Sequence, residues 1–226
     1  MAILIVGGSK GIGEQLLKNE FSNNSIINFS RSAPETAGPN ITHYEIDVLE
    51  DELPDLEGLQ SIIYCPGSIN LKPISSLKEA DFRTDFEINV IGAVRIIKKY
   101  AKQLKTADNS SIILFSTVAV AQGMPFHSSV AASKGAIEGL TKSLAAEFAP
   151  HIRVNAIAPS ITDTPLAAGI LRNAQAKEKL ADKHPLKRIL NASDIADMAS
   201  FLIGEKASAI TGQIFNIDAG LSTLKI

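Results

Sequence analysis

The stretch AILIVGGSKGIG, residues 2–13, decides the fold of this chain. Its first five residues, Ala2–Val6, form a candidate buried strand, and the next seven positions hold four glycines. Leu16, Leu17 and Phe21 then recur at the spacing of an amphipathic helix. A buried strand, a glycine-rich turn and a helix in immediate succession are typical of the first unit of a parallel α/β sheet.

Short apolar runs alternate with longer amphipathic stretches along the rest of the chain, which is the pattern of repeated βαβ units. We therefore predict a Rossmann-type, doubly wound α/β fold, mainly a seven-stranded parallel sheet with helices on both faces. No repeat or linker divides the sequence, so residues 1–226 are predicted to form a single domain. The predicted strands are Ala2–Val6, Ser25–Phe29, Thr42–Ile46, Gln60–Tyr64, Ser111–Phe115, Arg153–Ile157 and Gln213–Ile217.

Apolar residues three or four positions apart predict three further helices, over 81–104, 131–148 and 193–203. The second of them has more apolar surface than one sheet face covers, so part of it is expected to pack against another subunit. The third follows a plausible cap at Asn191 or Ser193. Residues 32–40 contain two prolines and a glycine, and they replace the helix expected between the second and third strands.

The composition argues against several classes of function. The formal net charge is −2 and there is no cluster of Lys and Arg, so we expect neither a nucleic acid nor a membrane as partner. Cys65 is the only cysteine and the four histidines are scattered, so neither a disulfide nor a metal site is expected. No signal peptide or membrane-spanning run of roughly 18 apolar residues is found, which favours a cytoplasmic protein acting on a small molecule.

The glycine loop is a candidate binding site for the pyrophosphate of a dinucleotide. Glycine permits positive φ angles, and it lets an anion approach the free N–H groups at the start of the following helix. An isolated loop of this kind is also found as an ordinary tight turn, but here the strand and the helix flank it as the motif requires. The loop residues expected at the cofactor are Gly7, Ser9, Lys10, Gly11, Ile12 and Gly13.

The end of the second strand indicates which dinucleotide is bound. An acidic residue there would bind the ribose hydroxyls of NAD and repel the 2′-phosphate of NADP, but this chain has Ser30 and Arg31. Lys10 in the glycine loop is expected to approach the same phosphate. These residues favour NADP(H) over NAD(H), unless Lys10 and Arg31 are simply two solvated surface cations.

The order of these motifs resembles the short-chain dehydrogenase/reductase family over nearly the whole chain, and within it the 3-oxoacyl-acyl-carrier-protein reductases. Gly7, Gly11 and Gly13 match the family's glycine motif, although Val6 stands where threonine is usual. Cys65-Pro66-Gly67 occupies the place of its Asn-Ala-Gly turn and keeps only the glycine. The resemblance implies further cofactor contacts at Asp47, Val48, Pro66, Gly67, Asn89, Lys134, Pro159, Ile161, Thr162 and Thr164, with Ser160 in place of a glycine.

The catalytic segment departs from the family pattern. Asn89 and Lys134 match two members of the catalytic tetrad, but Thr117 stands at the serine position and Val130 at the tyrosine position. That tyrosine exchanges a proton with the substrate oxygen while hydride moves, and valine has no proton to exchange. Losing such a group commonly lowers the rate by about 10²–10⁴.

Several interpretations of this departure remain open. His127, three residues before Val130, is a candidate replacement acid, or else a plain loop histidine. One hypothesis is an NADP(H)-dependent oxidoreductase of carbonyl or alcohol substrates with an altered proton donor. The other is a catalytically silent relative that binds NADP(H) as a sensor, scaffold or partner subunit. An engineered substitution at Val130 is a third possibility.

Two further expectations come from the resemblance. The region from Pro165 to Leu190 is expected to form a flap over the substrate, with an apolar cover that any packed helix would also show. Family members commonly form dimers or tetramers by pairing two long helices, which correspond here to residues 81–104 and 131–148. A homodimer or homotetramer is therefore expected.

Overall fold

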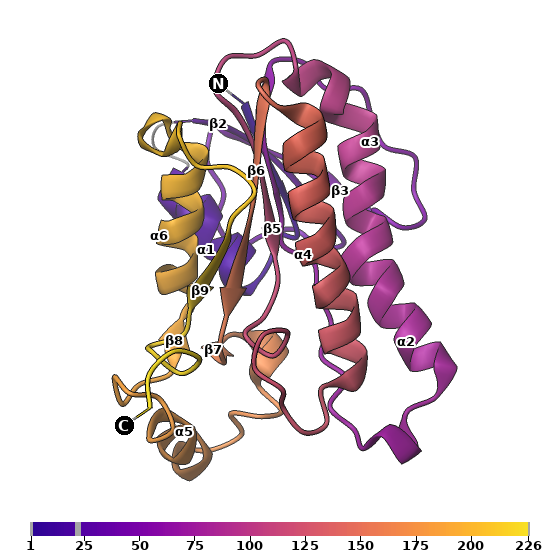
Figure 1. Cartoon of the computed structure of the whole chain (residues 1–226). Coiled ribbons are helices and arrows are strands. Elements are labelled where there is room, and N and C mark those ends of the chain that lie inside the picture. Colours follow the sequence, from indigo (N-terminus) through magenta and orange to yellow (C-terminus); the bar gives the residue numbers. More distant parts are fainter. Residues whose placement is uncertain (1, 21–23, 226) are drawn as a thin grey trace.

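The computed structural model describes residues 2–20 and 24–225 and confirms the predicted fold (Figure 1). Seven parallel strands form one sheet in the order β3-β2-β1-β4-β5-β6-β9, within a single domain. Helices α1 and α6 cover one face of the sheet, and α3 and α4 cover the other. The strands are β1 (Ala2–Val6), β2 (Ser25–Ser30), β3 (Ile41–Glu45), β4 (Leu59–Tyr64), β5 (Ser110–Phe115), β6 (Ile152–Pro159) and β9 (Ile214–Ile217).

The remaining elements are helices and one short strand pair. A π-helical turn, η2 (Glu87–Ile91), lies between α2 and α3, and two short strands, β7 (Thr162–Asp163) and β8 (Leu190–Asn191), pair beside the main sheet. Short 3-10 turns occur at 74–76, 165–167 and 205–207. The α-helices are α1 (Gly11–Glu20), α2 (Glu79–Phe86), α3 (Gly92–Leu104), α4 (Ser128–Phe148), α5 (Ala174–Ala181) and α6 (Ala192–Ile203).

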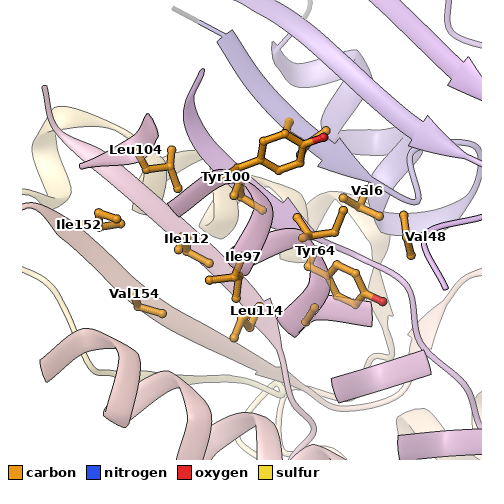
Figure 2. Close-up of a cluster of buried hydrophobic side chains, with 14 of the residues drawn as sticks. Val6, Val48, Tyr64, Ile97, Tyr100, Leu104, Ile112, Leu114, Ile152 and Val154 are labelled. Atoms are coloured by element: carbon orange, nitrogen blue, oxygen red, sulfur yellow. The ribbon is translucent and has the colours of Figure 1, made fainter. Parts of the chain in front are cut away.

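The central strands are buried on both faces of the sheet, which explains why their sequences are continuous apolar runs. Ile62 and Ile63 are neighbours on β4, both are fully buried, and they belong to different core clusters on opposite faces of the sheet. Figure 2 shows the cluster on the α3 and α4 face, where Ile97 and Leu104 lie against Ile112. The two layers of helices thus hold the sheet rigid from both sides.

The strand order reverses between β1 and β4. From β1 the chain runs outward through β2 and β3, and it then returns to place β4 on the other side of β1. In open parallel sheets a crevice forms at the carboxyl ends of the strands where the order reverses, and ligands bind there. The carboxyl ends of β1 and β4 are Val6 and Tyr64, so a ligand-binding site is expected at this edge of the sheet.

Some element boundaries differ from the sequence prediction. Strand β3 begins one residue earlier than predicted, and α4 begins at Ser128 rather than Ala131 because Ala131 N already donates to His127 O. Helix α5 was not predicted because none of its residues is buried, so it has no apolar stripe. As predicted, residues 32–40 contain no helix. Phe21, expected on α1, lies outside the described residues.

The helix predicted over 81–104 is divided by the π-helical turn. Tyr64 at the end of β4 donates from its hydroxyl to the carbonyl of Ile88 inside this turn, at 2.7 Å. Gly92 makes room for the tyrosine, because a Cβ there would lie 2.1 Å from the Tyr64 hydroxyl oxygen. Single π turns inside helices are frequent at functional sites, and this one contains Asn89.

Within the described ranges, no helix has the length and apolarity needed to cross a membrane.

Substitution of Gly92 tests this packing. We expect Gly92→Ala to lower the free energy of unfolding by about 1–3 kcal/mol, because the new methyl group displaces the buried Tyr64 ring. Gly139→Ala is the matched control, since that glycine lies exposed in α4 with open space around it and alanine favours the helix by about 0.5–1 kcal/mol. Denaturant unfolding measures both, and a Gly92→Ala protein as stable as the unmodified chain would contradict the account.

Candidate active site

The glycine loop joins the end of β1 to the start of α1 at the reversal of strand order. Gly7 and Gly11 have φ angles of +82° and +60°, which L side chains rarely adopt. A Cβ on Gly13 would lie 2.2 Å from the carbonyl oxygen of Gly7, so the helix approaches the strand too closely for any side chain. Ser9 and Ile12 lie between these glycines, partly buried. The first N–H groups of α1 have no partner within the helix, so the start of α1 offers hydrogen-bond donors at this edge of the sheet.

Asn28 on β2 ties this loop to the second strand. Its Oδ1 accepts a hydrogen bond from Gly8 N at 3.0 Å, and its Nδ2 donates to Ser30 Oγ at 2.9 Å and to His43 Nδ1 at 3.1 Å. Asn28 is fully buried. The position of the loop relative to the end of β2 is thus set by one side chain that the sequence analysis did not identify.

The residues expected to choose between NADP and NAD lie at this end of β2. Ser30 is buried and its hydroxyl donates to Ser32 O at 2.9 Å, so this hydroxyl proton is not available for a hydrogen bond to a ligand. Arg31 is exposed and lies 3.9 Å from a carboxylate oxygen of Asp47, while Lys10 is exposed on the loop. The two cations are therefore free to approach a ligand phosphate.

Three other residues expected at the cofactor, Asp47, Val48 and Pro66, have mainly structural contacts. Asp47 Oδ1 accepts from Leu49 N at 3.0 Å, and this bond shapes the turn after β3. Val48 is buried in the hydrophobic core. Pro66 packs against Gly7, with ring atoms 3.2 Å from where a Cβ on that glycine would lie.

A buried lysine and a buried asparagine face each other across Gly67. Lys134 Nζ donates to Phe115 O at 2.8 Å, and burial lowers the pKa of its ammonium group to about 8. Asn89 Nδ2 donates to Ser68 Oγ at 3.2 Å and to Ser133 Oγ at 3.1 Å, which leaves its buried Oδ1 without a partner. A Cβ on Gly67 would lie 3.4 Å from Asn89 Oδ1 and 3.5 Å from Lys134 Nζ. Both polar atoms therefore border one small space.

Val130 lies in the first turn of α4, one helical turn before Lys134 and 5% exposed. Thr117 follows β5, and its Oγ1 accepts from Ala119 N at 3.3 Å, which leaves the hydroxyl proton available. His127 bonds through Nδ1 to the carbonyl of Pro125 at 2.7 Å, a local contact that holds its ring in the preceding loop. The structure thus places an apolar side chain on the helix face that also carries Lys134.

No tyrosine takes over the place of Val130. Tyr64 donates to Ile88 O, and burial raises the pKa of its hydroxyl well above the usual range. Tyr100 donates to Pro54 O at 2.7 Å in the core, and burial raises its pKa to about 12. Tyr44 lies on the edge strand β3.

Cys65 follows β4 at the position where the family has asparagine. Burial raises the pKa of its thiol to about 12, although the neighbouring Lys134 charge acts in the opposite direction. The thiol is thus protonated at neutral pH, and a reactive thiolate at this position is not supported.

The loop after β6 closes the crevice from the other side. A Cβ on Gly11 would lie 3.3 Å from Thr164, so this loop touches the glycine loop directly. Pro159 ends β6, Ile161 O accepts from Leu190 N, and Thr162 donates to Ser160 O. Ser160 also bonds to the buried His184 at 3.0 Å, a contact between the loop and the region after α5 that the sequence did not reveal.

The sequence analysis also missed Asp85 on α2. It is fully buried, and its carboxylate accepts hydrogen bonds from Ser68 and Ser129. Nothing in the sequence marks Asp85 as buried, because α2 contains three acidic residues and carboxylates are rarely buried. In residues 2–20 and 24–225 no group of three or more His, Cys, Asp or Glu is placed to hold a metal ion.

Comparison with known proteins identifies the class. Residues 46–222 match the family model described as Enoyl-(Acyl carrier protein) reductase. A tropinone reductase homolog of Arabidopsis thaliana is 30% identical over 98% of this chain and 79% of its own length. The chain belongs to the short-chain dehydrogenase/reductase family, whose members are nicotinamide-dependent oxidoreductases of carbonyl and alcohol substrates.

Solved structures agree. The ligand-free aldohexose dehydrogenase of Thermoplasma acidophilum superposes with a TM-score of 0.91 at 25% identity, covering 99% of this chain and 94% of that one. The protein ElxO, solved with NADP bound, superposes with a TM-score of 0.88 at 25% identity and covers 99% of both chains.

Proposed function

We propose that this chain binds NADP(H) and is an oxidoreductase of a carbonyl or alcohol substrate whose turnover is limited by the loss of the proton-donating tyrosine. The observation that carries the proposal is that Lys134 Nζ and Asn89 Oδ1 border one small space at Gly67, while the side chain one helical turn before Lys134 is the valine Val130. The cofactor part and the turnover part of the proposal have separate support and separate tests.

The crevice fits a dinucleotide. The N–H groups at the start of α1 face the space where the pyrophosphate would lie, and Gly7, Gly11 and Gly13 leave room for it. In the described part of the chain, Lys134 Nζ donates one hydrogen bond and has two N–H groups left for the ribose hydroxyls of the nicotinamide half. Thr164 and the other residues of the loop after β6 would hold the carboxamide. The bound nicotinamide would supply or accept the hydride.

The preference for NADP(H) over NAD(H) rests on charge. Arg31 follows the end of β2 and Lys10 lies in the glycine loop, both with exposed side chains, and Asp47 is 3.9 Å from Arg31. A 2′-phosphate would replace this weak contact with shorter charge-assisted hydrogen bonds. The NADP bound in the ElxO structure, a relative of similar size, is consistent with this preference.

The chemistry on the substrate side is incomplete. Thr117 can donate one hydrogen bond to a carbonyl oxygen, but its hydroxyl does not release a proton readily at neutral pH. The ammonium of Lys134 is held by Phe115 O and by the expected ribose contacts. Reduction therefore has to draw its proton from water, which favours slow turnover. The buried, fully apolar Val130 also favours an alternative, a silent NADP(H)-binding sensor, scaffold or partner subunit.

A second copy of this chain is the proposed occupant of a groove between α3 and α4. The groove has a volume of about 420 Å³ and combines apolar side chains with lysines of α3 and Glu147 of α4. A two-fold contact brings the same patch against itself, so opposite charges on the two helices have partners. The groove is lined by Val94, Ile97, Lys98, Ala101, Lys102, Lys105, Leu140, Leu144, Glu147 and Phe148.

Restoring the tyrosine tests the turnover part. We expect Val130→Tyr to raise NADPH oxidation with ketones or 3-oxoacyl thioesters by about 10²–10⁴, because it returns a proton donor one helical turn from Lys134. Val130→Phe is the matched control, since it adds the ring without the hydroxyl. If both variants bind NADPH and neither oxidises it, the silent alternative holds. Turnover by the unmodified chain at the usual rates of about 1–10³ s⁻¹ would contradict impaired catalysis.

Charge removal tests the cofactor preference. We expect Lys10→Ala and Arg31→Ala each to weaken NADPH binding by about ten- to a hundredfold and to leave NADH binding nearly unchanged, since each removes a charge-assisted bond to the 2′-phosphate. Lys18→Ala is the control, because that lysine pairs with Glu14 on α1. Fluorescence titration measures the affinities. Equal losses for both cofactors would argue against contact with the 2′-phosphate.

Light scattering tests the assembly. We expect a dimer or a tetramer for the unmodified chain, and a smaller species for Leu144→Glu, because a carboxylate in the groove would be buried between subunits. Leu186→Glu serves as control, since Leu186 is 65% exposed and lies outside the groove. A monomeric unmodified chain would remove the basis for this interface.

A further inference from the structure

Asp85 occupies the last full turn of α2, and its side chain is completely buried. Its Oδ1 accepts from Ser68 Oγ at 2.6 Å and from Asn70 Nδ2 at 3.5 Å, and its Oδ2 accepts from Ser129 Oγ at 2.6 Å. Both oxygens thus accept from neutral donors, two in the loop after β4 and one in the first turn of α4. In the described residues no cation lies within ion-pair distance of this carboxylate.

The two 2.6 Å hydrogen bonds of Asp85 connect it to residues beside the candidate active site. Ser68 accepts from Asn89 Nδ2 at 3.2 Å, so the carboxylate is two hydrogen bonds from that asparagine. Ser129 directly precedes Val130 in the first turn of α4. One carboxylate therefore connects the loop after β4, the π turn and the start of the helix that carries Lys134.

The direction of these bonds determines the orientation of the Asn89 amide. Ser68 gives its only proton to Asp85, so toward Asn89 it presents lone pairs and accepts from Nδ2. The second Nδ2 hydrogen is donated to Ser133. With both amide hydrogens engaged, Oδ1 is the atom left facing the space beside Lys134 Nζ.

The charge of Asp85 acts on Lys134 as well. Burial is the largest effect on the pKa of Lys134 and lowers it, while Cys65 and, to a smaller extent, Asp85 act in the opposite direction. Cys65, on the loop after β4, also faces Lys134, but its own raised pKa keeps it neutral. Glu138 lies one turn further along α4 and accepts from Ser116 at 2.6 Å. Among these groups Asp85 is the buried carboxylate placed to favour the ammonium.

We propose that Asp85 is a positioning residue of this site, which orients the Asn89 amide through Ser68 and whose buried carboxylate acts on the side chain of Lys134 from the same hydrogen-bonded cluster. The proposal deepens the function proposed above and rests on it for the role of Lys134 in holding the cofactor. The two effects of Asp85, hydrogen bonding and charge, are separable by substitution.

Nuclear magnetic resonance on the cofactor-free protein with ¹³C-labelled lysine and ¹⁵N-labelled asparagine separates them. Asp85→Asn keeps the shape of the side chain and removes its charge. Ser68→Ala keeps the charge and breaks the hydrogen-bond link to Asn89. Ser129→Ala keeps both the charge and the link to Asn89. The Lys134 signal is assigned by its loss in Lys134→Met. We expect a midpoint near pH 8 in the unmodified chain, about one pH unit lower in Asp85→Asn, and unchanged in both serine variants. The Asn89 amide signals are expected to shift in Asp85→Asn and Ser68→Ala only.

Cofactor binding gives a second readout. At pH 6 Lys134 is an ammonium in both the unmodified chain and Asp85→Asn, so their NADPH affinities there differ only through Asn89. At pH 8 the ratio of the two affinities should be about fivefold larger than at pH 6, because about a tenth rather than half of the variant's Lys134 remains protonated.

Distinct results overturn the two proposals. A Lys134 midpoint that is the same in Asp85→Asn as in the unmodified chain, or that moves equally in Ser129→Ala, overturns the role assigned to the charge. Asn89 signals that do not respond to Ser68→Ala overturn the orienting role. An unmodified chain that binds no NADPH contradicts the proposed function, while the lysine titration still decides the role of Asp85. Asp85→Ser, also neutral but smaller, replaces Asp85→Asn if that variant does not fold.

Discussion

Helix α1 begins so close to the end of β1 that a Cβ on Gly13 would lie 2.2 Å from the carbonyl oxygen of Gly7. Three other segments at this edge of the sheet pack against the loop that this contact creates. Asn28 would overlap a Cβ on Gly8, while Pro66 packs on Gly7 and Thr164 on Gly11. These three residues come from β2 and from the loops after β4 and β6. Because the glycines of the loop have no side chains, residues on or after three different strands can pack closely around it.

The catalytic side of the crevice depends on a different constraint, the burial of opposite charges. Lys134 and Asp85 are both buried, and neither has an ion-pair partner in the described part of the chain. Isolated buried charges are unfavourable unless hydrogen bonds or an opposite charge compensate them. Here carbonyl, hydroxyl and amide groups supply the hydrogen bonds, and each charge lies in the field of the other. Asn89, in the π turn beside Gly92, is held between them.

Sequence reasoning identified the parts of this molecule that depend on local pattern. The seven strands, the glycine loop and the absence of a helix over 32–40 follow from short-range periodicity and from glycine and proline chemistry. The π turn was not predictable, because it depends on the Tyr64 hydroxyl, which arrives from a distant strand. Asn28 and Asp85 were missed for the same reason, since their partners lie 20 and 44 positions away in the chain. Helix α5 buries no residue and left no periodic signal.

The substitution at Val130 separates two tasks that one lysine performs in this family. Under the proposed function Lys134 would hold ribose hydroxyls, a task that requires only an ammonium at a fixed position. The hydrogen bond to Phe115 O and the helix α4 fix that position without a tyrosine. The second task of the lysine in the family is to lower the pKa of the tyrosine hydroxyl. Here that task does not arise, because the side chain at this position is the aliphatic Val130, which is 5% exposed. Valine fills its place in the first turn without leaving a buried polar group unpaired, so the fold loses little. The expected cost of the valine is therefore to the transition state of the reaction. There Thr117 could donate a hydrogen bond to the developing alkoxide, but no side chain could protonate it. If the proposed function holds, binding and turnover are therefore expected to diverge in this chain, because the groups proposed for binding are present and Val130 offers no proton to transfer.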